Sequence, residues 1–266
     1  MSDEKMPFFS HLEELRKRII ISLVAIGIGF ILTFSYSETI LGLLKRPLTT
    51  DLIFSRSYPF VRSTPRPGAS VELIFLAPAE AFWMHMKIAL LTGLMLVLPV
   101  VLHQIWKFIA PGLLPHEKRY ALPFVILGSI FFSFGLLFCF FIVLPFALRF
   151  LLTYKTEHLK PMLSIGNYVD FTAKFLLAFG VIFELPLAIG IAAKMGLVTP
   201  RSLSKNRKYA VLINFVIAAI LTPTPDVFNQ TLMALPMCLL YEVGILAARI
   251  LVRKPTPAPQ EAAEGV

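Results

Sequence analysis

The sequence predicts an all-α membrane protein that crosses the bilayer several times, and two observations support this fold class. Hydrophobic residues make up 57% of the 266 positions and charged residues only 15%, against about 45–50% and about 25% in soluble domains. The charged residues also divide the chain into six apolar intervals, and about 20 apolar residues suffice for one spanning helix. We therefore expect one polytopic domain over residues 1–254, with six transmembrane helices, and a disordered cytoplasmic tail over 255–266.

The six predicted spans differ in length. The fifth is the shortest, because Pro223 and Pro225 end an apolar body that begins at Tyr209. As a helix, that body rises only about 20 Å, less than the hydrocarbon core of about 30 Å, so we expect it to thin the bilayer locally or to sit behind other helices. The predicted spans are residues 19–37, 86–107, 120–148, 171–193, 209–222 and 230–249.

The net charge of +9 is explained by anchoring in the membrane, because basic residues cluster at the ends of the apolar intervals. With the N-terminus inside, 15 of the 25 Lys and Arg residues fall on the cytoplasmic side, as the positive-inside rule requires. Both termini are therefore predicted to be cytoplasmic, and no nucleic-acid partner is needed to explain the charge. The first external loop, about residues 38–78, holds five prolines and is predicted to be irregular or built of short helices.

Prolines at or inside the spans predict helices that bend. Each removes a backbone donor and tends to kink its helix, and kinked helices can curve together into a concave face. These residues are Pro99, Pro123, Pro145, Pro186 and Pro236.

Motifs of enzymes and ATP-driven pumps are missing from the sequence. It contains no phosphate-binding Gly-rich loop ending in Gly-Lys-Ser/Thr, no His-Glu-x-x-His and no Gly-x-Ser-x-Gly. The five histidines have no metal-binding spacing, and Cys139 and Cys238 fall in apolar segments that favour small buried side chains. We therefore expect no catalytic residue, no cofactor and no metal.

Two glutamates fall inside predicted spans. Glu184 is central in its interval and precedes Pro186, which leaves the carbonyl of Ile182 without its helical donor. A charge at that depth costs at least about 2.5–3.5 kcal/mol, so a functional polar site and a hydrogen bond to a neighbouring helix are the two interpretations. Glu242 lies nearer the cytoplasmic end, within two helical turns of Arg249, and either pairs with a basic residue at a helix end or has a function.

Acidic residues also precede the first span. Ser10 and Glu13 have the spacing of a capping box, which would give Glu13 a structural role. Glu14 is not needed for that cap and either pairs with Arg18 four residues on or receives a ligand. We expect it to lie off the apolar stripe of this helix, which comprises Leu12, Leu15 and Ile19.

Glu117 lies in a second acidic and basic segment on the predicted cytoplasmic side, either as an acid in the first turn of a helix or as a second ligand-binding carboxylate. Together Glu14 and Glu117 could each bind one guanidinium of an arginine pair, in a bidentate geometry that lysine cannot reproduce. On the external side, Asp226 either caps the last helix or, with Gln230, forms a functional loop.

Four motifs in this order resemble those of the TatC family, the multi-spanning receptor subunit of the twin-arginine protein translocase. They cover roughly residues 8–252. The motifs are His11-Leu-Glu-Glu-Leu-Arg-Lys-Arg18, Gln104-Ile-Trp-Lys-Phe-Ile-Ala-Pro-Gly-Leu-Leu-Pro-His-Glu-Lys-Arg119, Phe179-Gly-Val-Ile-Phe-Glu-Leu-Pro186 and Leu221-Thr-Pro-Thr-Pro-Asp-Val-Phe-Asn-Gln-Thr-Leu-Met-Ala-Leu-Pro-Met237.

The resemblance implies a glove-shaped bundle in the cytoplasmic (inner) membrane that recognises the Arg-Arg signal of folded precursor proteins. It implies single-span TatA and TatB partners in a multi-copy hetero-oligomer and transport driven by the proton-motive force. Glu14 and Glu117 would contact the twin arginines, and Glu184 would take part in assembly with a partner helix. The supporting residues on the cytoplasmic surface would be Arg16, Phe108, Pro111 and Arg119, and those in the external loops Pro47, Asp226 and Gln230.

Two alternatives to a translocase receptor remain at this point. A proton-coupled small-molecule transporter would use Glu184 as its proton carrier and would show internal symmetry, which the sequence lacks. A structural scaffold would use Glu184 only as a contact between helices.

Overall fold

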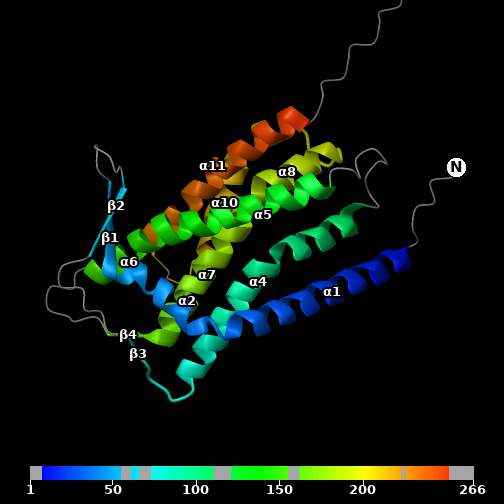
Figure 1. Ribbon diagram of the computed structural model, residues 1–266. Helices are drawn as coiled ribbons and strands as arrows, with labels where there is room; N and C mark the ends of the chain where they lie inside the picture. Colours follow the sequence, from blue (N-terminus) through cyan, green and yellow to red (C-terminus); the bar gives the residue numbers. More distant parts are fainter. Residues whose placement is uncertain are drawn as a thin grey trace, which may run out of the picture.

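The computed structural model describes residues 8–54, 61–65, 73–110, 121–154, 162–222, 224 and 226–251. Long helices dominate these residues, and Figure 1 shows the start of α1 and the end of α11 at the same end of the bundle. The elements are α1 (Phe8–Phe34), α2 (Ser37–Leu44), α3 (Arg46–Thr49), β1 (Thr50–Phe54), β2 (Val61–Pro65), β3 (Leu73–Ile74), α4 (Glu80–Ile109), α5 (Ala121–Phe138), the π-helix η3 (Cys139–Val143), α6 (Leu144–Thr153), β4 (Leu163–Ser164), α7 (Ile165–Phe183), α8 (Leu185–Lys194), α9 (Pro200–Lys205), α10 (Arg207–Leu221) and α11 (Val227–Leu251).

Each of the six intervals predicted to span the membrane holds a helix, and the protein is an all-α membrane protein. Five helical segments of the described ranges are long and apolar enough to cross a bilayer. The helix of the fifth interval, α10, has only 15 residues and rises about 22 Å. Its shortness follows from the two prolines after Leu221, as the sequence predicts.

Helices α1 and α4 form a close antiparallel pair. A Cβ atom added to Gly29 would lie 2.6 Å from the carbonyl oxygen of Gly93, a distance that only two glycines allow. One turn further along each helix, the Thr33 hydroxyl donates to the Ala89 carbonyl at 2.7 Å. These contacts fix the register of the two helices, because neither glycine can shift without a side chain meeting backbone.

Helix α7 packs against both α4 and α5, which also contact each other, and it carries the centre of the core (Figure 1). Its Phe175 and Phe179 side chains are fully buried. Two glycines let neighbouring chains approach: a Cβ on Gly135 of α5 would lie 2.6 Å from the Phe179 carbonyl, and one on Gly180 of α7 would lie 2.6 Å from the Phe132 ring. Close helix contact through small residues is typical of membrane bundles.

The regular α-helix is interrupted at or near two of the five predicted proline sites. Helix α7 ends at Phe183 and α8 begins at Leu185, so the helix is interrupted at Glu184, with Pro186 in the first turn of α8. The third interval changes to a π-helix directly before Pro145. Pro99 and Pro236 lie inside uninterrupted helices, α4 and α11.

Two local predictions are wrong. Ser10 is not an N-cap, because α1 already begins at Phe8, and Glu13 therefore loses the capping role assigned to it. The first loop contains the expected short helices α2 and α3, but also an antiparallel hairpin in which Thr50 pairs with Pro65 and Phe54 with Val61. The loop is rich in prolines, which disfavour strands, but it also contains β-branched residues, which favour them.

Hydrogen bonds tie the segments together at the end of the bundle opposite the N-terminus. Glu80, the first residue of α4, accepts from the Gly166 backbone at 2.8 Å and from the Ser164 hydroxyl. The Tyr168 hydroxyl donates to the Leu44 carbonyl. These bonds connect α2, α4 and α7 across long stretches of sequence, so this end of the bundle is cross-linked by polar contacts.

Candidate functional site

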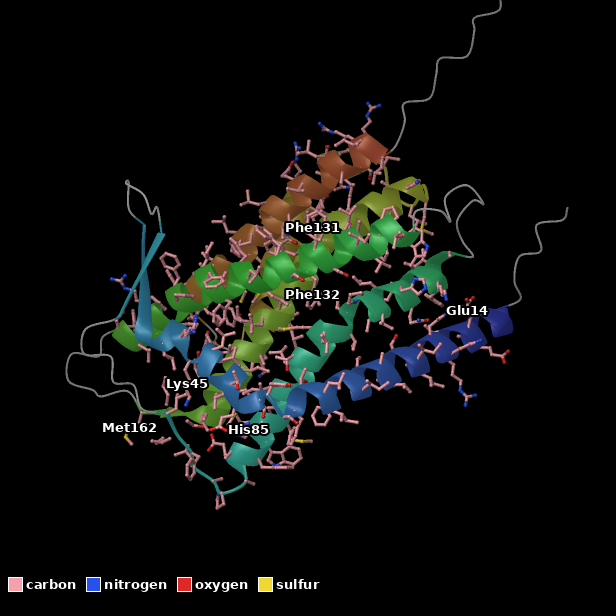
Figure 2. The ribbon with its side chains drawn as sticks, viewed as in Figure 1. Glu14, Lys45, His85, Phe131, Phe132 and Met162 are labelled. Atoms are coloured by element: carbon pink, nitrogen blue, oxygen red, sulfur yellow. The ribbon has the colours of Figure 1, made fainter. Side chains whose placement is uncertain are left out.

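The candidate site begins at the N-terminal end of α1, where Glu14 and Arg18 form an ion pair. Glu14 Oε1 accepts from Arg18 Nη2 at 2.9 Å, and the two side chains are only 17% and 20% exposed. Leu12 and Ile19 are 45% and 49% exposed on the outer face. Figure 2 labels Glu14 near this free end of α1.

The orientation of this helix reverses the expectation drawn from its apolar stripe. Glu14 does lie off the stripe, as predicted, but it faces inward and is paired with Arg18, while Leu12 and Ile19 of the stripe face outward and Leu15 is half-buried. The reversal has a simple cause: a bilayer, unlike water, favours apolar side chains on the outer surface. A ligand therefore reaches the Glu14 carboxylate in competition with Arg18.

The other residues predicted for this surface divide into two groups. Arg16 is exposed on α1, and Phe108 is half-buried in the last turn of α4. Pro111, Glu117 and Arg119 lie outside the described residues.

A groove of about 750 Å³ runs between α4, α5 and α8. Its walls are almost entirely apolar, with Phe108 from α4, Phe132 from α5 and Leu187 from α8 among them. Glu184 is the one charged residue among the described side chains that line it. The groove therefore joins two residues predicted separately, Phe108 and Glu184, on one surface.

Glu184 reaches this groove from the interruption between α7 and α8. Its Oε1 atom is buried and has no hydrogen-bond partner within the described part of the chain. A Cβ on Gly128 of α5 would lie 3.3 Å from Glu184 Oε2 and 2.9 Å from Leu102. The carboxylate thus occupies space that the missing side chain of Gly128 leaves open, and its unsatisfied oxygen can accept from an incoming donor.

Glu242 pairs with a basic residue at a helix end, one of the two predicted interpretations, but the partner is not on its own helix. Arg207 at the start of α10 donates from Nε at 2.7 Å and from Nη2 at 2.8 Å, a bidentate pair. Arg249, which the sequence suggested, instead donates to the Ser204 hydroxyl at 3.2 Å. Glu242 therefore joins α10 to α11 and is 46% exposed.

The residues predicted for the external loops serve packing and capping. Asp226 Oδ1 accepts from the Asn229 backbone at 2.7 Å, which confirms the predicted cap of α11. Gln230 Nε2 donates to the Phe215 carbonyl at 3.1 Å and so ties α11 to α10. Pro47 is buried in α3, next to the fully buried Leu48.

Two residues of the site carried no assigned role in the sequence. Gly128 shapes the floor beneath Glu184, and Gln104 on α4 is buried, with no partner for its side-chain oxygen among the described residues. The pairing of Arg18 with Glu14, in contrast, was one of the two predicted interpretations. Gln104 is the first residue of the second motif quoted above. As a polar residue within an apolar span, it could have been identified from the sequence as a candidate functional residue. Among the described residues, no group of three or more His, Cys, Asp or Glu could hold a metal ion.

Comparison with known proteins gives the family. The sequence model of the family described as Sec-independent protein translocase protein (TatC) matches residues 10–236. The TatC protein of Desulforapulum autotrophicum is 41% identical over 262 residues, covering 98% of this chain and 91% of the relative. The chain belongs to the TatC family.

Further TatC relatives and solved structures agree. The TatC protein of Aquifex aeolicus is 41% identical over 251 residues, covering 94% of this chain and 97% of the relative. A crystal structure of a twin-arginine translocase receptor TatC, 40% identical, superposes with a TM-score of 0.75 over 91% of this chain and all of that chain. This TatC protein is thus a multi-pass inner-membrane component of a Sec-independent protein translocase. Nothing in these likenesses supports the small-molecule transporter alternative.

Proposed function

We propose that this TatC protein is the receptor subunit that binds the Arg-Arg signal peptides of folded precursor proteins. In this proposal the chain crosses the membrane six times, with both termini in the cytoplasm, and assembles with single-span TatA and TatB subunits. The complex is driven by the proton-motive force. The observation that supports the proposal best is Glu14, a carboxylate held at 2.9 Å from a guanidinium group on the N-terminal surface of a TatC fold.

The Glu14 carboxylate already has the geometry of a guanidinium acceptor. Arg18 offers it a single bond, from Nη2, whereas an incoming arginine can form two parallel bonds. Glu117 is the second carboxylate of the proposal, for the second arginine of the signal. Arg16, Phe108, Pro111 and Arg119 would support this surface.

The groove between α4, α5 and α8 is proposed to receive the apolar part of the signal peptide. It has apolar walls, it includes Phe108 from the last turn of α4, and its volume of about 750 Å³ suits a few bulky side chains. Glu184, with one oxygen unpaired, would supply a polar contact to the peptide or to a partner helix in the membrane. Pro47, Asp226, Gln230 and Glu242 would act in holding the bundle and its external loops in shape.

Peptide binding to the purified protein in nanodiscs tests the proposal. We expect Glu14→Gln and Glu117→Gln each to weaken binding of an Arg-Arg peptide by about ten- to a hundredfold, the value of one charge-assisted pair. A Lys-Lys peptide should bind the native protein as weakly as the variants bind Arg-Arg. Glu13→Gln is the matched control, because Glu13 is a neighbouring exposed glutamate on the same helix; equal losses in Glu13→Gln and Glu14→Gln would contradict the proposal.

A further inference from the structure

Two buried polar atoms near the N-terminal end of the bundle have no hydrogen-bond partner in the described part of the chain: Arg18 Nε on α1 and Gln104 Oε1 on α4. Gln104 is only 7% exposed. One atom is a donor and the other an acceptor. Buried polar groups are nearly always paired, so two unpaired atoms of opposite type call for an explanation.

The register of α1 against α4 places Arg18 and Gln104 at facing positions of the two helices. Gly29 contacts Gly93, and Thr33 bonds to Ala89 one turn away. Because the two helices are antiparallel, a step toward the N-terminus of α1 corresponds to a step toward the C-terminus of α4. Arg18 lies eleven residues before Gly29, and Gln104 lies eleven residues after Gly93. Both side chains are long enough to meet across helices that separate gradually, as Figure 1 shows for this end of the pair.

We infer that Gln104 is a positioning residue for signal binding: its side-chain oxygen accepts a hydrogen bond from Arg18 when an incoming arginine binds to Glu14. Without a ligand, the Arg18 guanidinium bonds to Glu14. When a signal arginine displaces it, Arg18 would be a partly buried charge without its carboxylate partner, which is costly. Gln104 Oε1 supplies that acceptor, so the internal ion pair opens without stranding a charge. The inference rests on the proposed function and adds the regulation of its Glu14 site.

The chemistry of the amide suits this role. A carboxylate attracts the guanidinium group through its opposite charge as well as through the hydrogen bond, whereas an amide oxygen carries no net charge, so Gln104 does not remove Arg18 from Glu14 before a ligand arrives. A glutamate at position 104 would do so, and a methionine would offer no acceptor of comparable strength. The two substitutions therefore shift signal binding in opposite directions, whereas a purely structural glutamine would be weakened by both.

The test measures binding of an Arg-Arg signal peptide to the full chain in nanodiscs. Gln104→Met should weaken binding about tenfold, the value of one buried hydrogen bond, and Gln104→Glu should bind at least as tightly as the native protein. In an Arg18→Met background Glu14 has no internal competitor, so Gln104→Met should have no further effect. Thermal unfolding of each variant checks that it is folded.

The outcomes separate this inference from the proposed function. Any of three results would show that the inference is wrong while the receptor function stands. Gln104→Met could have no effect, or it could weaken binding equally with and without Arg18. Gln104→Glu could weaken binding as much as Gln104→Met does. If Glu14→Gln itself leaves Arg-Arg binding unchanged, the proposed function falls and the inference falls with it.

Discussion

Glu184 of the α7–α8 interruption and Gly128 of α5 fit against each other in the groove: a Cβ at position 128 would lie 3.3 Å from one carboxylate oxygen of Glu184 and 3.4 Å from the other. The glycine leaves the space that the carboxylate fills. The interruption before Pro186 points this side chain into the groove. Sequence and packing thus combine to keep one carboxyl group among apolar walls.

Gly128→Ala should impair transport while leaving the fold intact. The new methyl group would meet Leu102 at 2.9 Å and crowd Glu184, so it would narrow the groove, and overpacking of this kind costs about 1–3 kcal/mol. The measurement is export of a precursor with an Arg-Arg signal, together with the amount of protein in the membrane. The matched control is Gly27→Ala, where a Cβ meets nothing within 4 Å; equal export by both variants would show that the space at position 128 is not needed.

Gly29→Val should destabilise the bundle by about 1–3 kcal/mol or more. Any side chain at this position meets the Gly93 carbonyl at 2.6 Å, and backbone cannot move aside as a flexible side chain can. Thermal unfolding in detergent measures the loss. Gly27→Val lies two residues away with open space around it; a similar loss in both variants would point to helix propensity instead of the α1–α4 contact.

Glu184→Gln should reduce crosslinking of this chain to single-span partner subunits and leave Arg-Arg peptide binding at Glu14 largely unchanged. The substitution keeps the shape but replaces the carboxyl group, whose Oε1 has no partner among the described residues, with a neutral amide. Crosslinkers placed in the groove at Leu187 and Val181 report on the partner helix. Native levels of both crosslinking and export in this variant would reduce Glu184 to a contact between helices.

Asp226→Ala should destabilise α11 by about 0.5–2 kcal/mol, the usual value of a lost N-cap. Burial acts to raise the pKa of the Asp226 carboxyl, but hydrogen bonds from Asn229, Thr224 and the Phe228 backbone outweigh it and hold the pKa below its ordinary value of 3.8. The stabilisation from this group is therefore complete above pH 3.8 and is lost as the pH falls through the lowered pKa.

Unfolding measured against pH for the native protein and Asp226→Ala checks the sign. The difference in stability between the two should shrink as the pH falls below about 4. A difference that is constant down to the lowest accessible pH would mean that the ionised carboxylate contributes nothing.

The sequence predicts the helices of this protein well, because their length and apolar composition are local properties. It places helices in all six intervals, the short α10 among them, and the interruption beside Pro186. The sequence does not predict the hairpin of β1 and β2, since the hairpin depends on pairing between two segments of a proline-rich loop. The capping box at Ser10 failed because the helix begins two residues earlier.

The residue types of the candidate site were predictable, and so was the pair of Glu14 with Arg18 within one helix, but the pairings between helices were not. Glu14 and Glu184 stand out in the sequence as acids at or within apolar segments. The contact of Arg207 with Glu242, the position of Gly128 beneath Glu184, and the alignment of Arg18 with Gln104 depend on how helices pack against one another. Such contacts follow from close approaches such as that of Gly29 and Gly93, which no single helix specifies.

Site-specific crosslinking of an Arg-Arg signal peptide distinguishes docking at Glu14 and in the groove from binding elsewhere on the bundle. A photo-reactive group just after the twin arginines should label the N-terminal end of α1 around Glu14, and one in the apolar segment should label groove residues such as Ile105 and Leu187. Labelling should disappear with a Lys-Lys peptide. Labelling of the outer face at Ile19 and Leu23, or equal labelling by both peptides, would contradict the account.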